Sequence, residues 1–372
     1  MIPITKPFVG EEEAAAASQA ILSGWLSQGE QVQAFERAVA SYTGAQHAVA
    51  TSNCTTALHL ALIAAGVGPG DEVICPSFSF IATANSIIHA GATPVLVDID
   101  PRTYTVDPAA VKRAITPRTK AIMPVDQIGL AADLGAIAEI ARRNRLKVVE
   151  DAAPSLGATC GEGRVGSLSD FTCFSFHPRK SITTGEGGMV TTDHAEAADR
   201  LRVLRSHGAS TSDLARHKSG TTAIEEYREL GYNYRMTDIQ GAIGIVQMGR
   251  LETIIGERRR LAHRYSTLLA DDPRVATPFE PADRRHTFQS YALRLVNSRP
   301  RAVIMDELAR QGIATRRGVM AIHLEPLYRA RFPGVSLPIT EDATANTLLL
   351  PLFAGMTDAE QDTVVTALRA SL

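Results

Sequence analysis

Short apolar runs alternate with longer amphipathic runs along the first 250 residues of the chain. The apolar runs have the length and β-branched content of buried strands, and they occupy 73–78, 93–99, 120–125, 147–151, 171–176 and 188–192. Between them, stretches such as 134–144 and 195–204 carry apolar residues at helical spacing. This alternation predicts an α/β fold with a large, mostly parallel sheet wrapped by helices.

The pattern changes towards the C-terminus. A helix is expected from Thr237 onward, with three apolar residues on one face, Ile239, Ile243 and Val246, and the stretch 251–269 continues it into a second unit. There, 286–296 is typical of a strand and 301–313 of an amphipathic helix. We therefore predict a large domain over 1–250 and a smaller C-terminal α+β domain over 251–372. Within the large domain, the polar stretch 208–229 is expected to be a surface loop or a mobile flap.

Composition narrows the class of protein. The chain has 372 residues, 45% of them hydrophobic, and a formal net charge of −2, with lysine and arginine spread along its length. Neither nucleic-acid nor membrane binding is expected from such a charge distribution. The 4 cysteines include no CxxC pair and the 10 histidines no HxxxH motif, so we expect free thiols and no metal site. Residues 1–13 lack the basic start and apolar run of a signal peptide, and we expect a cytoplasmic protein.

The most informative segment is FSFHPRKSITTGEGGMVTT, residues 174–192. It is typical of a strand, a tight turn carrying Lys180, a polar glycine-rich loop and a second strand, and its glycines let the backbone approach another group closely. A lysine amine held in such a turn can form a Schiff base with an aldehyde, which is how pyridoxal 5'-phosphate (PLP) is held by its enzymes. A solvated surface lysine fits the same residues, so the interpretation depends on partners elsewhere.

One candidate partner is a carboxylate at the end of the strand 147–151. PLP chemistry needs a carboxylate against the pyridine nitrogen, because the protonated ring accepts electrons from the carbon that loses a proton. Asp151 stands at the carboxyl end of the strand, where the sites of open α/β sheets collect. Glu150 is its competitor, and strand alternation points the two side chains to opposite faces. A simple capping role for Asp151 fits the residues equally well.

A second candidate partner is a phosphate cradle within 49–66. This stretch runs from a strand into an alanine-rich helix, with polar side chains at the join: Ser52, Asn53, Thr55 and Thr56. A helix N-terminus offers free N–H groups and a favourable dipole to an anion. Ser175, five residues before Lys180, can add another hydroxyl. Ordinary N-capping uses the same residue types and remains the alternative.

These segments resemble the nucleotide-sugar aminotransferases of the DegT type, which are fold-type I PLP enzymes. The likeness runs nearly end to end, through SNCTTALHLAL, GVGPGDEVICPSFSFIATANSI, VVEDAAPSLGA, FSFHPRKSITTGEGGMV and LGYNYRMTDIQGAIG. Several long motifs in the right order make the resemblance specific. It implies a large PLP-binding domain with a mostly parallel sheet and a smaller C-terminal α+β domain.

The resemblance also implies roles for individual residues. Lys180 would form the Schiff base and shuttle the proton, and Asp151 would pair with the pyridinium nitrogen. The phosphate would be bound by three hydroxyl residues, Thr55, Thr56 and Ser175. Phe80 would stack on the cofactor ring, although it fits core packing of an alternating strand as well.

Further positions are implied at the subunit contact and near the substrate. Asn233 would reach the phosphate from the neighbouring subunit of a homodimer. The positions near the substrate are Trp25, Arg235 and His323.

Three residues depart from the family pattern. Cys54 stands where a glycine or small residue is common, and it fits there as a small hydrophobe. Pro154 replaces Gln or His near the cofactor hydroxyl, which puts one polar contact in doubt. Asp126, in PVDQIG, replaces a histidine, which we interpret as the mark of a subgroup with altered substrate contacts.

The resemblance implies a PLP-dependent aminotransferase that moves an amino group, from glutamate, to a keto group of a deoxysugar carried by a nucleotide diphosphate. The stretches HTFQSY and TRRGVMAIH favour C4 over C3 as the aminated carbon. The alternatives are an aminotransferase for a free cyclitol ketone and a non-catalytic regulatory homologue, and the intact Lys180 and Asp151 argue against the second. Lys180 also argues against the family's dehydratase branch, in which histidine replaces the lysine.

Overall fold

A seven-stranded sheet forms the centre of the large domain in the computed structural model, which describes residues 1–210 and 226–372. The strand order is β1-β9-β8-β5-β4-β2-β3. The bounds are β1 (His47–Thr51), β2 (Glu72–Pro76), β3 (Thr93–Val97), β4 (Thr119–Ile122), β5 (Lys147–Asp151), β8 (Phe171–Ser175) and β9 (Gly188–Thr192). From β3 to β8 the neighbouring strands are parallel, whereas β9 pairs antiparallel with both β8 and β1. The predicted α/β class with a mostly parallel sheet is confirmed.

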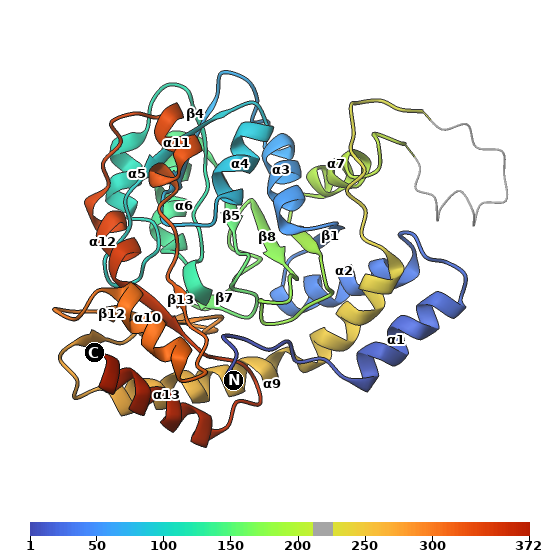
Figure 1. Cartoon of the computed structure of the whole chain (residues 1–372). Coiled ribbons are helices and arrows are strands. Elements are labelled where there is room, and N and C mark those ends of the chain that lie inside the picture. Colours follow the sequence, from blue (N-terminus) through green and yellow to red (C-terminus); the bar gives the residue numbers. More distant parts are fainter. Residues whose placement is uncertain (211–225) are drawn as a thin grey trace.

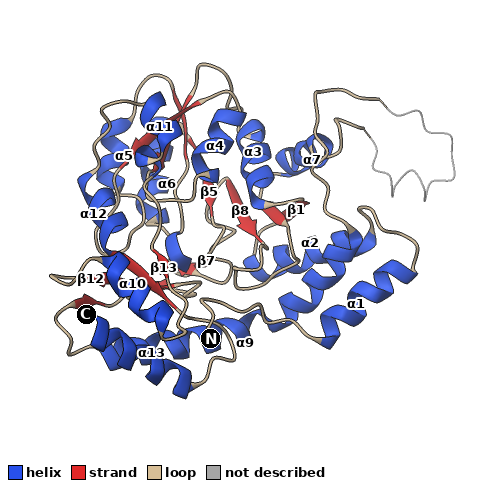
Figure 2. Ribbon diagram, in the orientation of Figure 1, coloured by secondary structure: helices blue, strands red, loops and turns tan. Residues whose placement is uncertain are grey.

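Helices pack against both faces of this sheet (Figures 1 and 2). One face is covered by α3 (Cys54–Ala64), α4 (Ala82–His89) and α7 (Ala195–Leu204). The other is covered by α2 (Glu30–Thr43), α5 (Pro108–Ala114), α6 (Leu134–Asn144) and part of α9 (Asp238–Leu269). The alternation of β1 explains the two layers, because Val49 joins the first cluster while Ala48 and Ala50 join the second.

The N-terminal half of α9 lies against α1 (Glu11–Leu22) and α2. Two glycines permit this approach: a Cβ on Gly241 would lie 2.6 Å from the Val32 nitrogen, and one on Gly244 would lie 2.8 Å from the Phe35 ring. In this N-terminal half, the side of α9 that packs against α2 therefore carries small residues. The expected apolar face of this helix, Ile239, Ile243 and Val246, stays partly exposed.

A second sheet forms the C-terminal α+β unit, with the strand order β10-β12-β14-β13. Its strands are β10 (Val275–Ala276), β12 (Tyr291–Leu295), β13 (Arg316–Arg317) and β14 (Thr347–Leu350). Its helices are α10 (Arg301–Arg310), α11 (Pro326–Arg331), α12 (Pro338–Asn346) and α13 (Asp358–Ser371). The strand expected over 286–296 is shorter than predicted, because the chain before β12 forms a loop in which Phe288 has a φ of +49°.

The predicted boundary at 250 falls inside α9, a continuous helix of 32 residues that runs from α1 and α2 to α13 (Figure 1). Other contacts also join the two parts. A three-stranded sheet combines β11 (Arg284–Arg285) with β6 (Thr159–Cys160) and β7 (Gly163–Arg164). The division into 1–250 and 251–372 therefore stays a prediction.

Two further expectations concern the chain as a whole. In 1–210 and 226–372, no helix is long and apolar enough to cross a membrane. All four cysteines are free, as expected. Most of the expected loop or flap at 208–229 lies outside the described residues, which leave out 211–225.

Candidate active site

Lys180 lies on a tight turn between β8 and β9, as the sequence predicted. The Lys180 N–H donates to the His177 carbonyl at 2.8 Å, and the Arg179 N–H donates to His177 Nδ1 at 3.2 Å. The Thr183 hydroxyl donates to the Phe176 carbonyl at 2.8 Å and ties the following loop to the end of the strand. The side-chain amine of Lys180 forms no hydrogen bond or ion pair with any described residue. The turn therefore holds the backbone of Lys180 while leaving its amine available.

The electrostatic surroundings favour a reactive amine. Burial lowers the pKa of Lys180 below its ordinary value, and the negative charge of Asp151 only partly opposes this shift. Burial likewise raises the pKa of Asp151, against the opposing effects of the Thr83 hydrogen bond and of Lys180. A lowered lysine pKa increases the share of the neutral amine, which is the form that adds to a carbonyl.

The Thr83 hydroxyl holds the Asp151 carboxylate at the carboxyl end of β5, and the Ser79 hydroxyl contacts Thr83 in turn. Thr83 Oγ1 donates to Asp151 Oδ2 at 2.7 Å, and Ser79 Oγ lies 2.7 Å from Thr83 Oγ1. The Ala153 N–H donates to the other oxygen, Asp151 Oδ1, at 3.3 Å. The sequence analysis did not assign roles to Thr83 or Ser79. Ser79 lies within SFSF and Thr83 follows three residues after Phe80, but nothing in the sequence separates these hydroxyls from ordinary ones at a helix start.

Glu150 lies on the opposite face of β5 and belongs to a different cluster. Thr172 Oγ1 donates to Glu150 Oε2 at 2.8 Å, and Glu150 interacts with Asp126. The Ser155 hydroxyl donates to Asp126 at 2.7 Å. Both carboxyl groups are fully buried, and burial raises the pKa of each, with the charge of Glu150 raising that of Asp126 further. Asp126 therefore has no surface open to a substrate, contrary to the expectation from the sequence.

The start of α3 offers unused donors to an anion. Asn53 Oδ1 accepts the Thr56 N–H at 3.0 Å, and Thr56 Oγ1 donates to the Asn53 carbonyl at 2.7 Å, so Thr56 serves in the cap. The N–H groups of Cys54 and Thr55 donate to no described residue. A Cβ on Gly188 would lie 2.4 Å from the Asn53 carbonyl oxygen, so this glycine is what lets β9 approach the helix start. The cradle thus combines free N–H groups with a helix dipole.

The two aromatic residues of SFSF differ in solvent exposure. Phe78 is 1% exposed and packs in the core, whereas Phe80 is 59% exposed. Core packing therefore does not account for Phe80, and its ring is available to stack on a ligand. Ser175 is partly buried near Lys180, and its hydroxyl oxygen accepts the His177 N–H at 3.4 Å.

The remaining predicted residues lie in other settings. Asn233 is exposed and its backbone bridges Ser206, while Arg235 is partly buried. Trp25 Nε1 donates to the Gln28 carbonyl at 3.3 Å. His323 is buried, with Nδ1 2.7 Å from Ser77 Oγ and Nε2 3.2 Å from Glu341. Both ring nitrogens of this histidine are therefore engaged within the chain.

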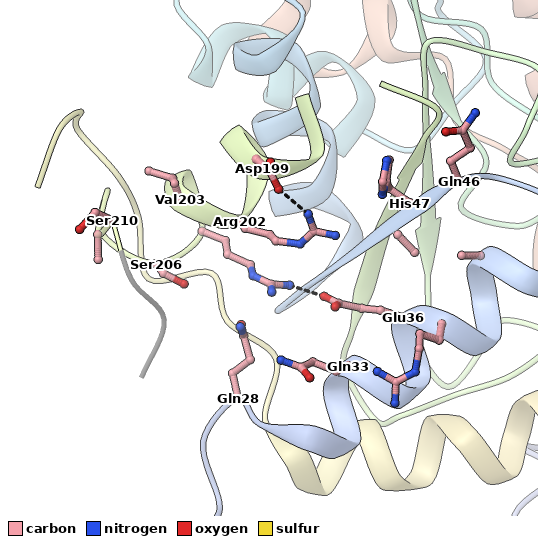
Figure 3. Close-up of a pocket in the computed structure, with 15 residues that line it drawn as sticks. Gln28, Gln33, Glu36, Gln46, His47, Asp199, Arg202, Val203, Ser206 and Ser210 are labelled. Carbon is pink, nitrogen blue, oxygen red and sulfur yellow. Dashed lines mark hydrogen bonds and ion pairs between the residues drawn. The ribbon is translucent and has the colours of Figure 1, made fainter. Parts of the chain in front are cut away.

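A polar pocket of about 690 Å³ lies beside α2 and α7 (Figure 3). Its walls include the buried ion pair of Arg205 with Glu36, and Gln33 and Ser206 line it as well. None of the predicted site residues lines this pocket, so it is separate from the lysine site.

The lysine site fits PLP, which combines an aldehyde, a basic ring nitrogen and a phosphate. The available amine of Lys180 suits the aldehyde, and the Asp151 carboxylate suits the ring nitrogen. The free N–H groups of Cys54 and Thr55 suit the phosphate. This set of groups on an α/β sheet is that of a PLP-dependent enzyme.

Comparison with known proteins identifies the family. A model of the DegT/DnrJ/EryC1/StrS aminotransferase family matches residues 7–369. The chain is 40% identical to the spore coat polysaccharide biosynthesis protein SpsC of Bacillus subtilis (strain 168), over 99% of this chain and 96% of that protein. The protein belongs to the DegT/DnrJ/EryC1/StrS family, and it is a PLP-dependent sugar aminotransferase.

Solved structures agree with this assignment. The aminotransferase TlmJ of Streptoalloteichus hindustanus is 33% identical, with a TM-score of 0.92 over 100% of this chain and 98% of that one. Spr1654 of Streptococcus pneumoniae, described as a sugar aminotransferase, is 29% identical in its pyridoxamine phosphate form. Its TM-score is 0.94, over 100% of this chain and 99% of that one. The recognised family, the fold-type I architecture and PLP as the cofactor are confirmed.

Proposed function

We propose that this protein transfers an amino group from glutamate to the C4 keto group of a deoxysugar linked to a nucleotide diphosphate. The observation that carries the proposal is the amine of Lys180 near the buried Asp151, together with the N–H donors at the start of α3. Among the residues that the structure describes, neither the amine nor these donors have a partner. Sugar transamination agrees with the family, and the four free thiols fit a reducing compartment such as the cytoplasm. The nucleotide carrier, the donor and the C4 position are the specific parts of the proposal.

When bound, PLP supplies an electron sink for the carbon that gains or loses the proton. Lys180 would hold the cofactor and would also move the proton, because its amine has no partner among residues 1–210 and 226–372. Asp151 would keep the ring nitrogen protonated, and Thr83 orients Asp151 through the 2.7 Å hydrogen bond. The start of α3 would bind the phosphate with Thr55, Thr56 and Ser175, for which the Thr56 hydroxyl has to turn away from the Asn53 carbonyl. Phe80 would cover the ring.

Two residues in loops are proposed to contact the substrate, and a third is proposed to act at one remove. Trp25 precedes α2, and Arg235 precedes α9. His323 is proposed to act through Ser77, since its ring is engaged there and Ser77 stands three residues before Phe80. In this arrangement, His323 positions the loop that carries the aromatic residue.

We also propose that the active protein is a homodimer in which Asn233 reaches the phosphate of the other subunit. Asn233 is exposed, and the nearby face of α9, with Ile239, Ile243 and Val246, remains partly uncovered. A two-fold interface would cover this apolar stripe and bring each Asn233 towards the opposite site.

Complementation of two inactive variants tests the shared site. Co-expressed Asn233→Ala and Lys180→Ala chains should recover activity, because one site of each hybrid dimer receives both intact residues from opposite chains. Asn233→Ala alone should bind PLP more weakly at unchanged folding, as measured by absorbance titration and circular dichroism. Full activity of a monomer in sedimentation at the assay concentration would exclude the shared site.

A substrate panel tests the reaction. Nucleotide-linked 4-keto and 3-keto sugars and a free keto-cyclitol are each incubated with the enzyme and glutamate, and the products are identified by mass spectrometry and NMR. We expect an amine at C4 of a nucleotide-linked sugar. Amination of the cyclitol alone, or at C3 alone, would contradict the proposed substrate, and the absence of any product with every ketone would contradict the sugar half-reaction.

A further inference from the structure

Two arginines, one in the lysine turn and one in the C-terminal sheet, interact electrostatically and have no acidic partner among residues 1–210 and 226–372. Arg179 directly precedes Lys180, and its side chain is exposed. Its carbonyl accepts a hydrogen bond from Gln289 Nε2 at 2.6 Å, which brings the loop before β12 against the turn. Since Gln289 belongs to the C-terminal unit, this contact places that unit at the edge of the site.

The sheet of the C-terminal unit carries the second arginine, Arg316. In the register, Ala292 of β12 lies opposite Leu349 of β14, and Leu349 lies opposite Arg316 of β13. Residues directly opposite in neighbouring strands share a face. Leu349 packs against a cluster that contains Phe78 and Ile128 of the large domain, so Arg316 is on the face that is turned towards that domain.

The electrostatics agree with this placement. Partial covering of the Arg179 guanidinium lowers its pKa, and the charge of Arg316 lowers that pKa further. Neither arginine forms an ion pair with residues 1–210 or 226–372. Arg317 differs, because it points to the other face of β13 and lies 3.8 Å from Glu325.

We propose that Arg179 and Arg316 form the subsite that binds the diphosphate of the nucleotide-linked sugar. Two like charges held close together without a counter-charge repel each other, and a dianionic ligand between them removes that cost. Guanidinium groups also match phosphate oxygens in paired hydrogen bonds. The inference rests on the proposed function. It adds that one arginine from each domain binds the diphosphate.

Inorganic pyrophosphate is a probe that contains the diphosphate without sugar or base. We expect titration calorimetry with the PLP-loaded enzyme to show binding that weakens about tenfold or more in Arg316→Gln, the typical loss for one charge-assisted contact. Arg179→Gln should show a similar loss, but Arg316→Gln is decisive because it lies outside the lysine turn. Arg317→Gln, next along the strand and on the opposite face, is the matched control, with affinity expected within about twofold of wild type.

Single-turnover kinetics separates this subsite from a site for the donor carboxylates. Arg316→Gln should weaken the apparent affinity for the nucleotide-linked keto sugar at least tenfold more than that for glutamate. Equal losses for both substrates, or pyrophosphate binding that is the same in Arg316→Gln and Arg317→Gln, would overturn the proposal. Arginine-dependent pyrophosphate binding together with no amination of any keto sugar would support the subsite and overturn the proposed function.

Discussion

Replacing Lys180 with alanine is expected to lower turnover by about 10³-fold or more, because general acid–base catalysis alone contributes roughly 10²–10⁴-fold and the covalent link to the cofactor is lost as well. The variant should still fold, since the turn around Lys180 is held by backbone contacts and by the Thr183 hydroxyl. It should also still bind PLP without a covalent bond, because the start of α3 is unchanged. Steady-state rates, circular dichroism and absorbance titration measure these three properties.

Borohydride reduction tests independently whether Lys180 is the lysine that binds the cofactor covalently. In the wild-type protein, peptide mapping should place the reduced cofactor on Lys180. Lys120→Ala, at an exposed lysine of β4, is the control and should behave as wild type. A reduced cofactor on any other lysine, or an unchanged rate in Lys180→Ala, would show that the assignment is wrong.

Replacing Asp151 with asparagine should slow the half-reaction with glutamate by about 10²-fold or more, the usual effect of removing one preorganised electrostatic group. Asparagine has nearly the same shape and retains an oxygen that can accept the Thr83 hydrogen bond, so the fold and much of the PLP affinity should persist. What is lost is the negative charge that keeps the ring nitrogen protonated. Stopped-flow absorbance of the glutamate half-reaction, compared with a PLP titration, separates the two effects.

Glu150→Gln is the matched control for this prediction. Glu150 is the neighbouring carboxyl residue on the same strand, but it contacts Thr172 and Asp126 on the opposite face. Its replacement should leave the glutamate half-reaction within a few-fold of wild type. A severe loss in Glu150→Gln together with a mild one in Asp151→Asn would mean that the roles of the two carboxylates are reversed.

The sequence was sufficient for the sheet and for several helices because their signals are local. Short buried runs with β-branched residues became strands of the central sheet, and the amphipathic stretches 134–144 and 195–204 coincide with α6 and α7. The packing of α9 was not predictable in this way. Its contact with α2 is made at Gly241 and Gly244. A search for apolar residues at helical spacing does not register glycines, even where they allow two helices to approach closely.

The sequence was enough to propose site residues that stand in a recognisable motif. It was not enough where the role of a residue depends on which side chains lie next to it in the fold. The sequence could not choose between a cofactor role and a capping role for Asp151. In the structure, the side chain of Asp151 lies with Thr83 and near the charge of Lys180. Thr83 itself was missed, because a hydroxyl in the first turn of a helix looks the same in sequence whether it serves the helix or a carboxylate far along the chain.

The buried pair of Asp126 and Glu150 makes the proton a ligand of the native state. The folded protein raises the pKa of both carboxyl groups above the values of an unfolded chain, which are about 4. The folded protein therefore binds more protons than the unfolded chain once the pH exceeds about 4, and the slope of the unfolding free energy with pH from this pair is negative. Its contribution to stability is complete below the unfolded pKa values and is lost as the pH rises through the folded ones. The buried acid pair next to Asp151 therefore makes the folded enzyme less stable as the pH rises, because alkaline conditions remove protons that the folded state binds more tightly than the unfolded chain.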